Sequence, residues 1–278
     1  MPMQDRLNQN ERFFGGHRTI HQSRSSLMNK LEDVVTYCDE RTRSPGFPDF
    51  PGAMNGLQVS NSGHVSRIGA AVDAGLVPFE QAIERGVDFL IVHHGLFWTP
   101  PNPLTGTNYR KIKTLFEGDC AIYGCHLPLD AHPEIGNNVL LAFRLGLTPS
   151  GTFLPFEGHD LGVLAQCSYE RDELRDRLEV LFPSCIAAIE CGPKEVDRIA
   201  IVTGGGSSAL AELSTSGTST LITGELRQHH FNQAQEAGWN LYCCGHYATE
   251  TFGVSALAEE AAAKFGINWE FIETECPL

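Results

Sequence analysis

The sequence predicts an α/β protein made of two similar units, and three observations support this prediction. Apolar, strand-like runs alternate with helix-length stretches, which is typical of strands that pair in parallel. The same order of strands, turns and helices occurs twice along the chain. In both copies the strand-like runs end in polar residues, at the place where α/β proteins gather functional groups.

The repeat is clearest when the chain from Arg67 is compared with the chain from Arg198. Each arginine opens a short strand-like run, and a second apolar run follows after 23 residues, at 90–94 in one copy and at 221–225 in the other. A third run in each copy ends in a histidine. The shared spacing indicates an internal duplication.

The third runs end at His126 and His246, and each histidine is followed four residues later by a carboxylate, Asp130 or Glu250. Alternatively, all α/β units share an order of strand, turn and helix. That alternative does not explain the matched pairs of histidine and carboxylate. If the two units pack about a pseudo-two-fold axis, equivalent strand ends meet in one cleft, and both pairs can face the same point.

The predicted domain organisation follows the repeat. Residues 1–26 are polar without an apolar period, and we expect a disordered or loosely docked extension there. The first unit is expected to comprise residues 27–130 together with 240–278, and the second unit residues 131–239. A helix is expected after Ser26, with the apolar residues of one face at Leu27, Leu31, Val34, Val35 and Cys38.

Composition excludes several classes of function. The formal charge is −14, with 34 acidic and 20 basic side chains, which opposes binding to nucleic acid or to an anionic membrane. No apolar stretch approaches the roughly 18 residues that span a bilayer, and the first 26 residues lack the apolar core of a signal peptide. Nine cysteines without a C-x-x-C pair favour free thiols in a reducing compartment over disulfides or a thiolate zinc site. We therefore expect a cytoplasmic protein.

Two adjacent histidines, His93 and His94, stand where the apolar run at 90–94 ends. As buried structural residues, each would need hydrogen-bond partners for its ring nitrogens. A metal cluster could engage both at once. Imidazole nitrogens combined with carboxylate oxygens, without a thiolate, suit zinc, iron, manganese, cobalt or nickel.

Three segments, 93–98, 126–138 and 245–250, resemble the signatures of the NIF-three-like family, often catalogued as GTP cyclohydrolase I type 2 homologues. Segments 55–59 and 223–225 also resemble family motifs, and the chain resembles the short form of the family. The resemblance implies two interlocked α/β units, a dinuclear metal site in the cleft between them, and a homo-oligomeric ring, often a hexamer. It assigns the role of metal ligand to His93, His94, Asp130, His246 and Glu250. Five side chains cannot fill two metal shells, and open positions are typical of catalytic sites.

The repeat places His126 opposite His246 and Glu225 opposite His94. Both are therefore expected to line the cleft, either as partners that orient metal ligands or as groups that transfer protons. The glycine-rich turn 203–208 could hold an anion on free backbone amides or serve only as a tight structural turn. Aromatic residues Phe97, Trp98 and Tyr109 could stack on a planar substrate or simply pack in a loop.

The sequence favours a metal-dependent hydrolase that acts on a nucleotide or phosphoester. Two ions about 3.5–4 Å apart would activate a bridging water at neutral pH, and Glu225 or His126 would move the proton. The catalogue name of the family suggests a guanine nucleotide as substrate. The alternative from another class is a non-catalytic metal-binding assembly or adaptor protein. A nucleic-acid-binding ring is opposed by the acidic balance.

Overall fold

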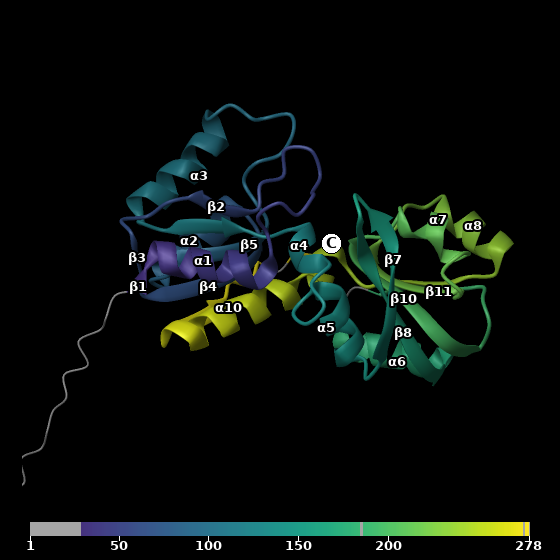
Figure 1. Ribbon diagram of the computed structural model, residues 1–278. Helices are drawn as coiled ribbons and strands as arrows, with labels where there is room; N and C mark the ends of the chain where they lie inside the picture. The colour runs from purple at the N-terminus through teal and green to yellow at the C-terminus, as the bar shows by residue number, and fades with distance from the viewer. Residues whose placement is uncertain (1–28, 184–185, 275, 278) are drawn as a thin grey trace, which may run out of the picture.

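The computed structural model describes residues 29–183, 186–274 and 276–277. The extension predicted at residues 1–26 lies outside this part of the chain. The described chain forms two β-sheets with helices on their faces (Figure 1). The predicted mixed α/β class is confirmed.

The first sheet has five strands in the order β13-β4-β5-β6-β2. Its centre is parallel, because β4 pairs with β5 and β13, and β5 pairs with β6, all in the parallel sense. β2 closes one edge by pairing antiparallel with β6. The strands are β2 (Gly56–Val59), β4 (Arg67–Asp73), β5 (Phe89–His94), β6 (Ala121–Gly124) and β13 (Asn268–Phe271).

Helices cover both faces of the first sheet because its central strands are apolar on both sides. One face packs against α1 (Leu31–Thr42) and α10 (Thr251–Phe265), and the other against α2 (Leu76–Glu84) and α3 (Gly106–Glu117). The predicted first helix corresponds to α1, which buries three of the expected residues, Leu31, Val34 and Cys38. The short strands β1 (Asn29–Lys30) and β3 (His64–Val65) form a separate two-stranded sheet.

The second sheet has six strands in the order β7-β8-β10-β11-β12-β9. β10, β11 and β12 are parallel, whereas β8 and β9 pair antiparallel with the two outer members of this trio, and β7 pairs antiparallel with β8. The strands are β7 (Thr148–Phe156), β8 (His159–Glu170), β9 (Ala187–Glu190), β10 (Glu195–Gly205), β11 (Thr220–Glu225) and β12 (Asn240–Cys243).

Four helices cover the second sheet. α5 (Asn137–Arg144) and α6 (Arg171–Leu181) pack on one face, and α7 (Ala209–Leu213) and α8 (His230–Ala237) pack on the other. No helix in the described ranges is long and apolar enough to cross a bilayer.

Each of the two sheets contains three adjacent parallel strands in chain order. These are β4-β5-β6 in the first sheet and β10-β11-β12 in the second. Each third strand is followed by a single short helical turn and then by a longer helix that packs on the other sheet. α5 follows β6 but contributes Leu141 and Ala142 to the core of the second sheet, and α10 follows β12 but contributes Val254 and Leu257 to the core of the first. The two units therefore exchange helices across the cleft.

The predicted unit boundary at residue 240 differs from the strand pairing. Residues 240–243 form β12, which pairs with β11 and β9 of the second sheet rather than with any strand of the first. The prediction grouped this strand with the candidate ligands that follow it. Strand pairing instead retains β12 in the second unit, and the chain returns to the first sheet only with α10 and β13.

Candidate metal centre

The five predicted metal ligands meet at the carboxyl ends of the parallel strands. His93 and His94 are the last residues of β5. Asp130 ends the one-turn helix α4 (Leu127–Asp130), which follows β6, and His246 opens the one-turn helix α9 (His246–Thr249), which follows β12. Glu250 comes directly after α9. Each short helix places its carboxylate one turn beyond the preceding histidine, as the four-residue spacing predicts.

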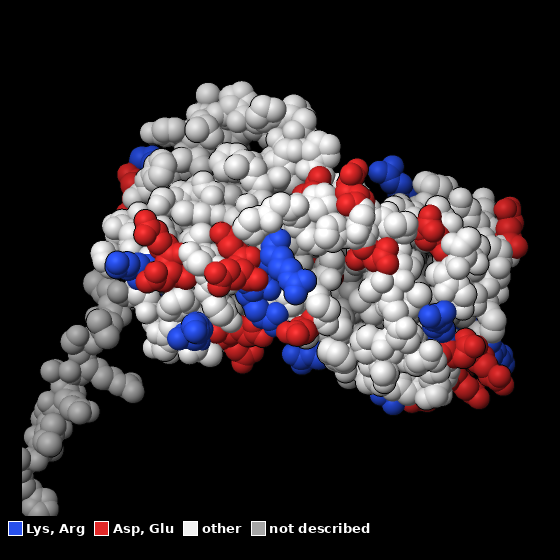
Figure 2. Space-filling model, in the orientation of Figure 1, with Lys and Arg blue, Asp and Glu red and all other residues white. Residues whose placement is uncertain are grey.

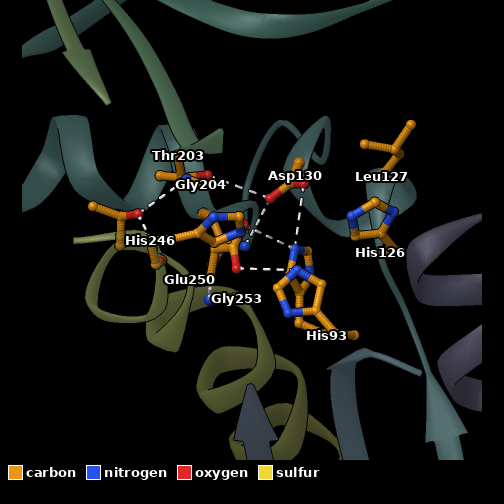
Figure 3. A network of polar contacts seen from close by, with 12 residues as sticks. His93, His126, Leu127, Asp130, Thr203, Gly204, His246, Glu250 and Gly253 are labelled. Carbon is orange, nitrogen blue, oxygen red and sulfur yellow. Dashed lines mark hydrogen bonds and ion pairs between the residues drawn. The ribbon is translucent and has the colours of Figure 1, made fainter. Parts of the chain in front are cut away.

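The carboxylate of Glu250 lies at the middle of the group. Its Oε1 is 3.5 Å from His93 Nε2 and 3.2 Å from His246 Nε2, and its Oε2 is 3.3 Å from His94 Nε2. Asp130 Oδ2 is 3.4 Å from His93 Nε2. In Figure 3, Glu250 lies between His246 and His93, and a dashed line joins Asp130 to His93.

The five side chains form two overlapping triplets. One consists of His93, Asp130 and Glu250, and the other of His94, His246 and Glu250; within each triplet the candidate ligand atoms lie within 4.8 Å of one another. The ring centroids of His94 and His246 are 5.3 Å apart. Histidines from the two units therefore face a common point, as the predicted cleft requires.

The donor atoms fit divalent cations. His93 Nε2 and Glu250 Oε2 are buried and have no hydrogen-bond partner among the described residues, which is costly for polar atoms. The distances of 3.2–3.5 Å between imidazole nitrogens and carboxylate oxygens exceed the roughly 2.7–2.9 Å of a charge-assisted hydrogen bond. A cation among these atoms would satisfy the lone pairs that the protein itself does not.

The outer ring nitrogens of the three histidines are already engaged. Nδ1 of His93 donates to the carbonyl of Cys125 at 2.9 Å, and Nδ1 of His94 donates to Asp73 Oδ1 at 2.8 Å. His246 Nδ1 lies 3.2 Å from Glu225 Oε1. A proton on Nδ1 leaves the lone pair on Nε2, and this arrangement orients histidine ligands in metal sites.

Asp130 is held in the same manner. Asn137 Nδ2 donates to its Oδ1 at 2.8 Å, and Thr203 Oγ1, which comes from the second sheet, lies 3.4 Å from the same oxygen. Asn137 is fully buried. These contacts occupy Oδ1 and leave Oδ2 directed at His93.

His126 lies beside the ligand cluster, as predicted. Its ring centroid is 5.0 Å from that of His93 and 5.5 Å from that of His94. Nδ1 donates to Asp49 Oδ1 at 2.8 Å, so Nε2 is the free ring nitrogen. Asn55 Nδ2 and the Leu127 amide donate to the other oxygen of Asp49. His126 is therefore fixed by a carboxylate that has three further hydrogen bonds, including one from the Phe50 amide.

Glu225 differs from His126 in exposure. Its side chain is 61 % exposed, and its contact with the cluster runs through His246 Nδ1. The structure therefore places these two residues differently with respect to the cluster. His126 faces the ligands directly, whereas Glu225 lies behind one of them.

The pKa values of the cluster show how strongly its charges interact. Burial lowers the pKa of His93, but the carboxylates of Asp130 and Glu250 outweigh burial and hold it well above its usual value. The hydrogen bond to Glu250 raises the pKa of His246 to about 9. Burial raises the pKa of Glu250, but the neighbouring imidazoles, His93 first, lower it far more. Carboxylates that stabilise positive charge on the neighbouring imidazoles so strongly would also stabilise a cation between them.

The glycine-rich turn 203–208 allows the side chains of Glu250 and His246 to lie close to the backbone, and it does not serve to bind an anion. A Cβ on Gly204 would overlap Glu250 Oε1 and lie 3.0 Å from His246 Nε2. The amides of Thr203, Gly204 and Gly206 already donate to Asn138 Oδ1, Thr249 Oγ1 and the Glu225 carbonyl, respectively. Of the two interpretations given above, the structure favours the tight structural turn.

Three functional residues were missed by sequence reasoning. Asp73 is the last residue of β4 and orients His94, and its position as a polar residue at the end of an apolar run could have revealed it. Asn137 lies within the motif 126–138 and could have been inferred from it. Asp49 stands in a loop rich in proline and glycine, and no spacing in the sequence relates it to His126.

A cavity of about 290 Å³ opens onto the cluster between the two units. His94, His126, Asp130, His246 and Glu250 line it together with the polar side chains of Asn138, Thr203 and Ser208, and Leu127, Leu154, Leu161 and Val202 supply an apolar wall. The ligand cluster is thus accessible to a small molecule through a partly apolar cavity.

Fold and site together define a mixed α/β protein with a buried cluster of histidines and carboxylates that can hold metal ions. The sequence signature of the Duf34/NIF3 (NGG1p interacting factor 3) family matches residues 30–277, and the chain belongs to this family. The predicted resemblance is confirmed.

Relatives and solved structures agree with this assignment. A Deinococcus radiodurans protein named GTP cyclohydrolase 1 type 2 homolog is 37 % identical over 243 residues, which cover 87 % of this chain and 92 % of that protein. The crystal structure of TTHA1606 from Thermus thermophilus is 38 % identical, with a TM-score of 0.78 over 90 % of this chain and all of that one. Protein ybgI, described as of unknown function, is 34 % identical with a TM-score of 0.83 over the same shares.

Proposed function

We propose that the cluster binds two divalent metal ions and that the protein is a metal-dependent hydrolase acting on a nucleotide or phosphoester. The observation that carries the proposal is the pair of triplets that share Glu250. One carboxylate oxygen faces His93 and His246, and the other faces His94. Glu250 would help to hold both ions, because its carboxylate oxygens lie among the imidazole nitrogens of both triplets. The donor set suits zinc, iron, manganese, cobalt or nickel.

Divalent ions bound here would supply Lewis-acid catalysis and make water nucleophilic at neutral pH. The protein residues would hold the ions, orient the substrate and move protons. Hydrolysis of a phosphoester joins the oxygen of water to phosphorus and breaks the ester P–O bond. The attacking water loses a proton, and the departing oxygen gains one.

We assign the proton transfer to His126 rather than to Glu225. His126 lines the 290 Å³ cavity and presents Nε2, because Nδ1 is bonded to Asp49. Burial raises the pKa of Asp49, but its contacts with His126, Asn55 and the Phe50 amide together lower it below its usual value, so it remains a carboxylate that can orient the ring. Glu225 contacts His246 behind the cluster, and its proposed role is to orient that ligand.

We also propose that the two units arose by internal duplication. In support, β4-β5-β6 and β10-β11-β12 are equivalent trios of parallel strands, and each trio ends in residues of the cluster or next to it. Assembly into a homo-oligomeric ring, most simply a hexamer, and a cytoplasmic location remain predictions from the sequence.

The second candidate function is a non-catalytic metal-binding assembly or adaptor protein. The observation that favours it is the description of the family as an interacting factor. GTP cyclohydrolase activity is the third candidate, and it rests on the names of the curated relatives.

The deciding experiment measures metal and turnover on the same samples. Protein purified without added metal is analysed for elemental content, loaded with each candidate ion, and assayed against a panel of nucleotides and phosphoesters. We expect about two ions per chain and turnover of at least one phosphoester, both lost in His94→Ala. His64→Ala, at an exposed histidine of β3, is the matched control. Two ions without turnover would favour the adaptor, and fewer than one ion would contradict the metal centre.

A further inference from the structure

A second cavity adjoins the ligand cluster. It has a volume of about 610 Å³ and lies against residues 95–104, the loop that follows β5. His94 and Trp98 line both this cavity and the 290 Å³ cavity over the cluster. The two cavities therefore meet at these side chains, and a molecule bound at the cluster can extend past Trp98. We call the larger one the loop cavity.

The loop cavity is lined mainly by apolar and amide groups. Within the described chain no phosphate-binding set of cations surrounds it, and its polar lining includes the side-chain amides of two asparagines, which can pair with the edge of a heterocycle. The apolar and amide residues are Met54, Leu96, Phe97, Trp98, Asn102, Leu104, Asn108 and Ile112.

Acidic and basic side chains are scattered over the face of the molecule shown in Figure 2, without a broad basic patch among the described residues on that face. The residues that line the two cavities also restrict the charge of the ligand. Among the described residues that line them, Lys111 is the only lysine or arginine, and its Nζ already donates to the carbonyl of Ala74 at 3.2 Å. Asp73, Asp130 and Glu250 supply negative charge. Beyond the metal ions, little positive charge is available to neutralise a polyphosphate.

Trp98 is held in place before any ligand binds. Its indole Nε1 donates to the carbonyl of Gly95 at 2.9 Å, and the amide of the next residue, Thr99, donates to the carbonyl of Pro51 at 3.2 Å. Its ring stands nearly perpendicular to that of His126, with centroids 5.2 Å apart. A fixed aromatic ring beside the cluster can bind a planar group with little loss of side-chain entropy.

From these contacts, and resting on the proposed function, we infer that the substrate is a phosphoester with one phosphate at the metal centre and a planar, uncharged ring stacked on Trp98 in the loop cavity. A nucleoside monophosphate or another aromatic phosphoester fits this description. A nucleoside triphosphate does not, because its additional phosphates would lie in cavities whose described lining offers one lysine against three carboxylates.

Binding of two phosphonates to the metal-loaded full-length protein tests the inference without turnover. Phenylphosphonate and methylphosphonate share a head group that is not hydrolysed and differ in the ring, and calorimetric titration gives the dissociation constant of each. We expect phenylphosphonate to bind about tenfold more tightly, as expected from stacking one ring on an aromatic side chain. Trp98→Ala should remove this preference at unchanged metal content, and Trp98→Phe should keep most of it. Phe116→Ala, at an exposed residue of α3 outside both cavities, is the control.

Equal affinities for the two phosphonates in the wild-type protein would overturn the inference, as would a preference that survives Trp98→Ala. Tighter binding of GTP than of GMP would also overturn it, since the triphosphate would then have found cations that the cavity lining lacks. Failure of the proposed hydrolase is a different result. It would be absence of turnover across the phosphoester panel while the preference for phenylphosphonate persists.

Discussion

The two units contribute to the candidate metal centre in different ways. At three positions that the register aligns, a strand end of the first unit carries a side chain, whereas the second unit carries glycine. The pairs in the register of the repeat are Asp73 and Gly204, His93 and Gly224, and Cys125 and Gly245. At these positions the first unit presents His93 on a rigid strand, and the second unit leaves room for the turn that carries its own donors, His246 and Glu250.

The glycines of the second unit are required by close packing. A Cβ on Gly224 would lie 2.6 Å from the carbonyl oxygen of Gly204 and 2.7 Å from the Cα of His246. Gly204 and Gly245 also have positive φ angles, of 64° and 90°. Because these residues lack side chains, the turn that carries His246 and Glu250 can rest directly on β10 and β11. Positions that the register aligns therefore have different roles in the two units.

The largest expected effect is the loss of metal on substitution of Glu250, whose carboxylate belongs to both triplets. Glu250→Gln keeps the size of the side chain but removes the charge, and we expect metal content to fall from about two ions per chain to nearly none. Elemental analysis after gel filtration measures this. Glu225→Gln is the matched control, because its carboxylate contacts the cluster only through His246. If Glu250→Gln retained one ion, each triplet would bind independently of this shared carboxylate.

Substitutions of two neighbouring glycines test whether the second unit leaves room for the turn that carries His246 and Glu250. Gly204→Ala should lower the free energy of unfolding by more than about 1 kcal/mol and reduce metal content, because the methyl group would overlap Glu250 and φ is 64°. At Gly205 a Cβ meets nothing within 4 Å, so Gly205→Ala should be close to neutral. Chemical denaturation of both variants gives the comparison. Equal stabilities would contradict the role assigned to Gly204.

Substitutions of the carboxylates that orient His94 and His246 should have intermediate effects on metal affinity, and these effects should differ between the two units. Asp73→Asn removes the charged partner of His94, and we expect metal affinity to fall about 10- to 100-fold. Glu225→Gln should weaken binding less, because Glu225 is 61 % exposed and its contact with His246 is longer. Competition with a chelator of known affinity ranks the two variants. The reverse ranking would show that the exposed carboxylate of the second unit dominates.

The smallest expected effect is the pH dependence of the metal-free protein. The pKa of His246 is raised to about 9 by Glu250, so its stabilising contribution is complete below its unfolded pKa of about 6.5 and is lost as the pH rises through about 9. The free energy of unfolding measured between about pH 6 and pH 10 in chelator should therefore decrease. The decrease should be smaller in His246→Gln. An increase over this range would contradict the assignment.

The sequence predicts the part of the site that depends on local spacing. The four-residue steps from His126 to Asp130 and from His246 to Glu250 correspond to one helical turn in α4 and α9, which brings each pair together. The apolar run before His93 predicts a buried strand that ends at the cluster. These features depend on neighbours in the chain, and so a single sequence contains them.

Features that depend on tertiary contact could not be predicted in the same way. Asp49 reaches His126 across 77 residues, and no local pattern records that hydrogen bond. The boundary at residue 240 was placed by the position of ligands, although the pairing of β12 with β11 decides it. The roles of Gly204 and Gly224 become visible only when the distances to Glu250 and His246 are known.

The exchange of α5 and α10 also bears on how the molecule unfolds. Each of these helices is covalently continuous with one half and completes the apolar interior of the other. Separating the two halves would expose both apolar cores to water at once, so neither half is a self-sufficient folding unit. The protein should melt in one cooperative transition, and the distance between the two halves at the candidate ligand cluster is set by the crossover helices rather than by a hinge.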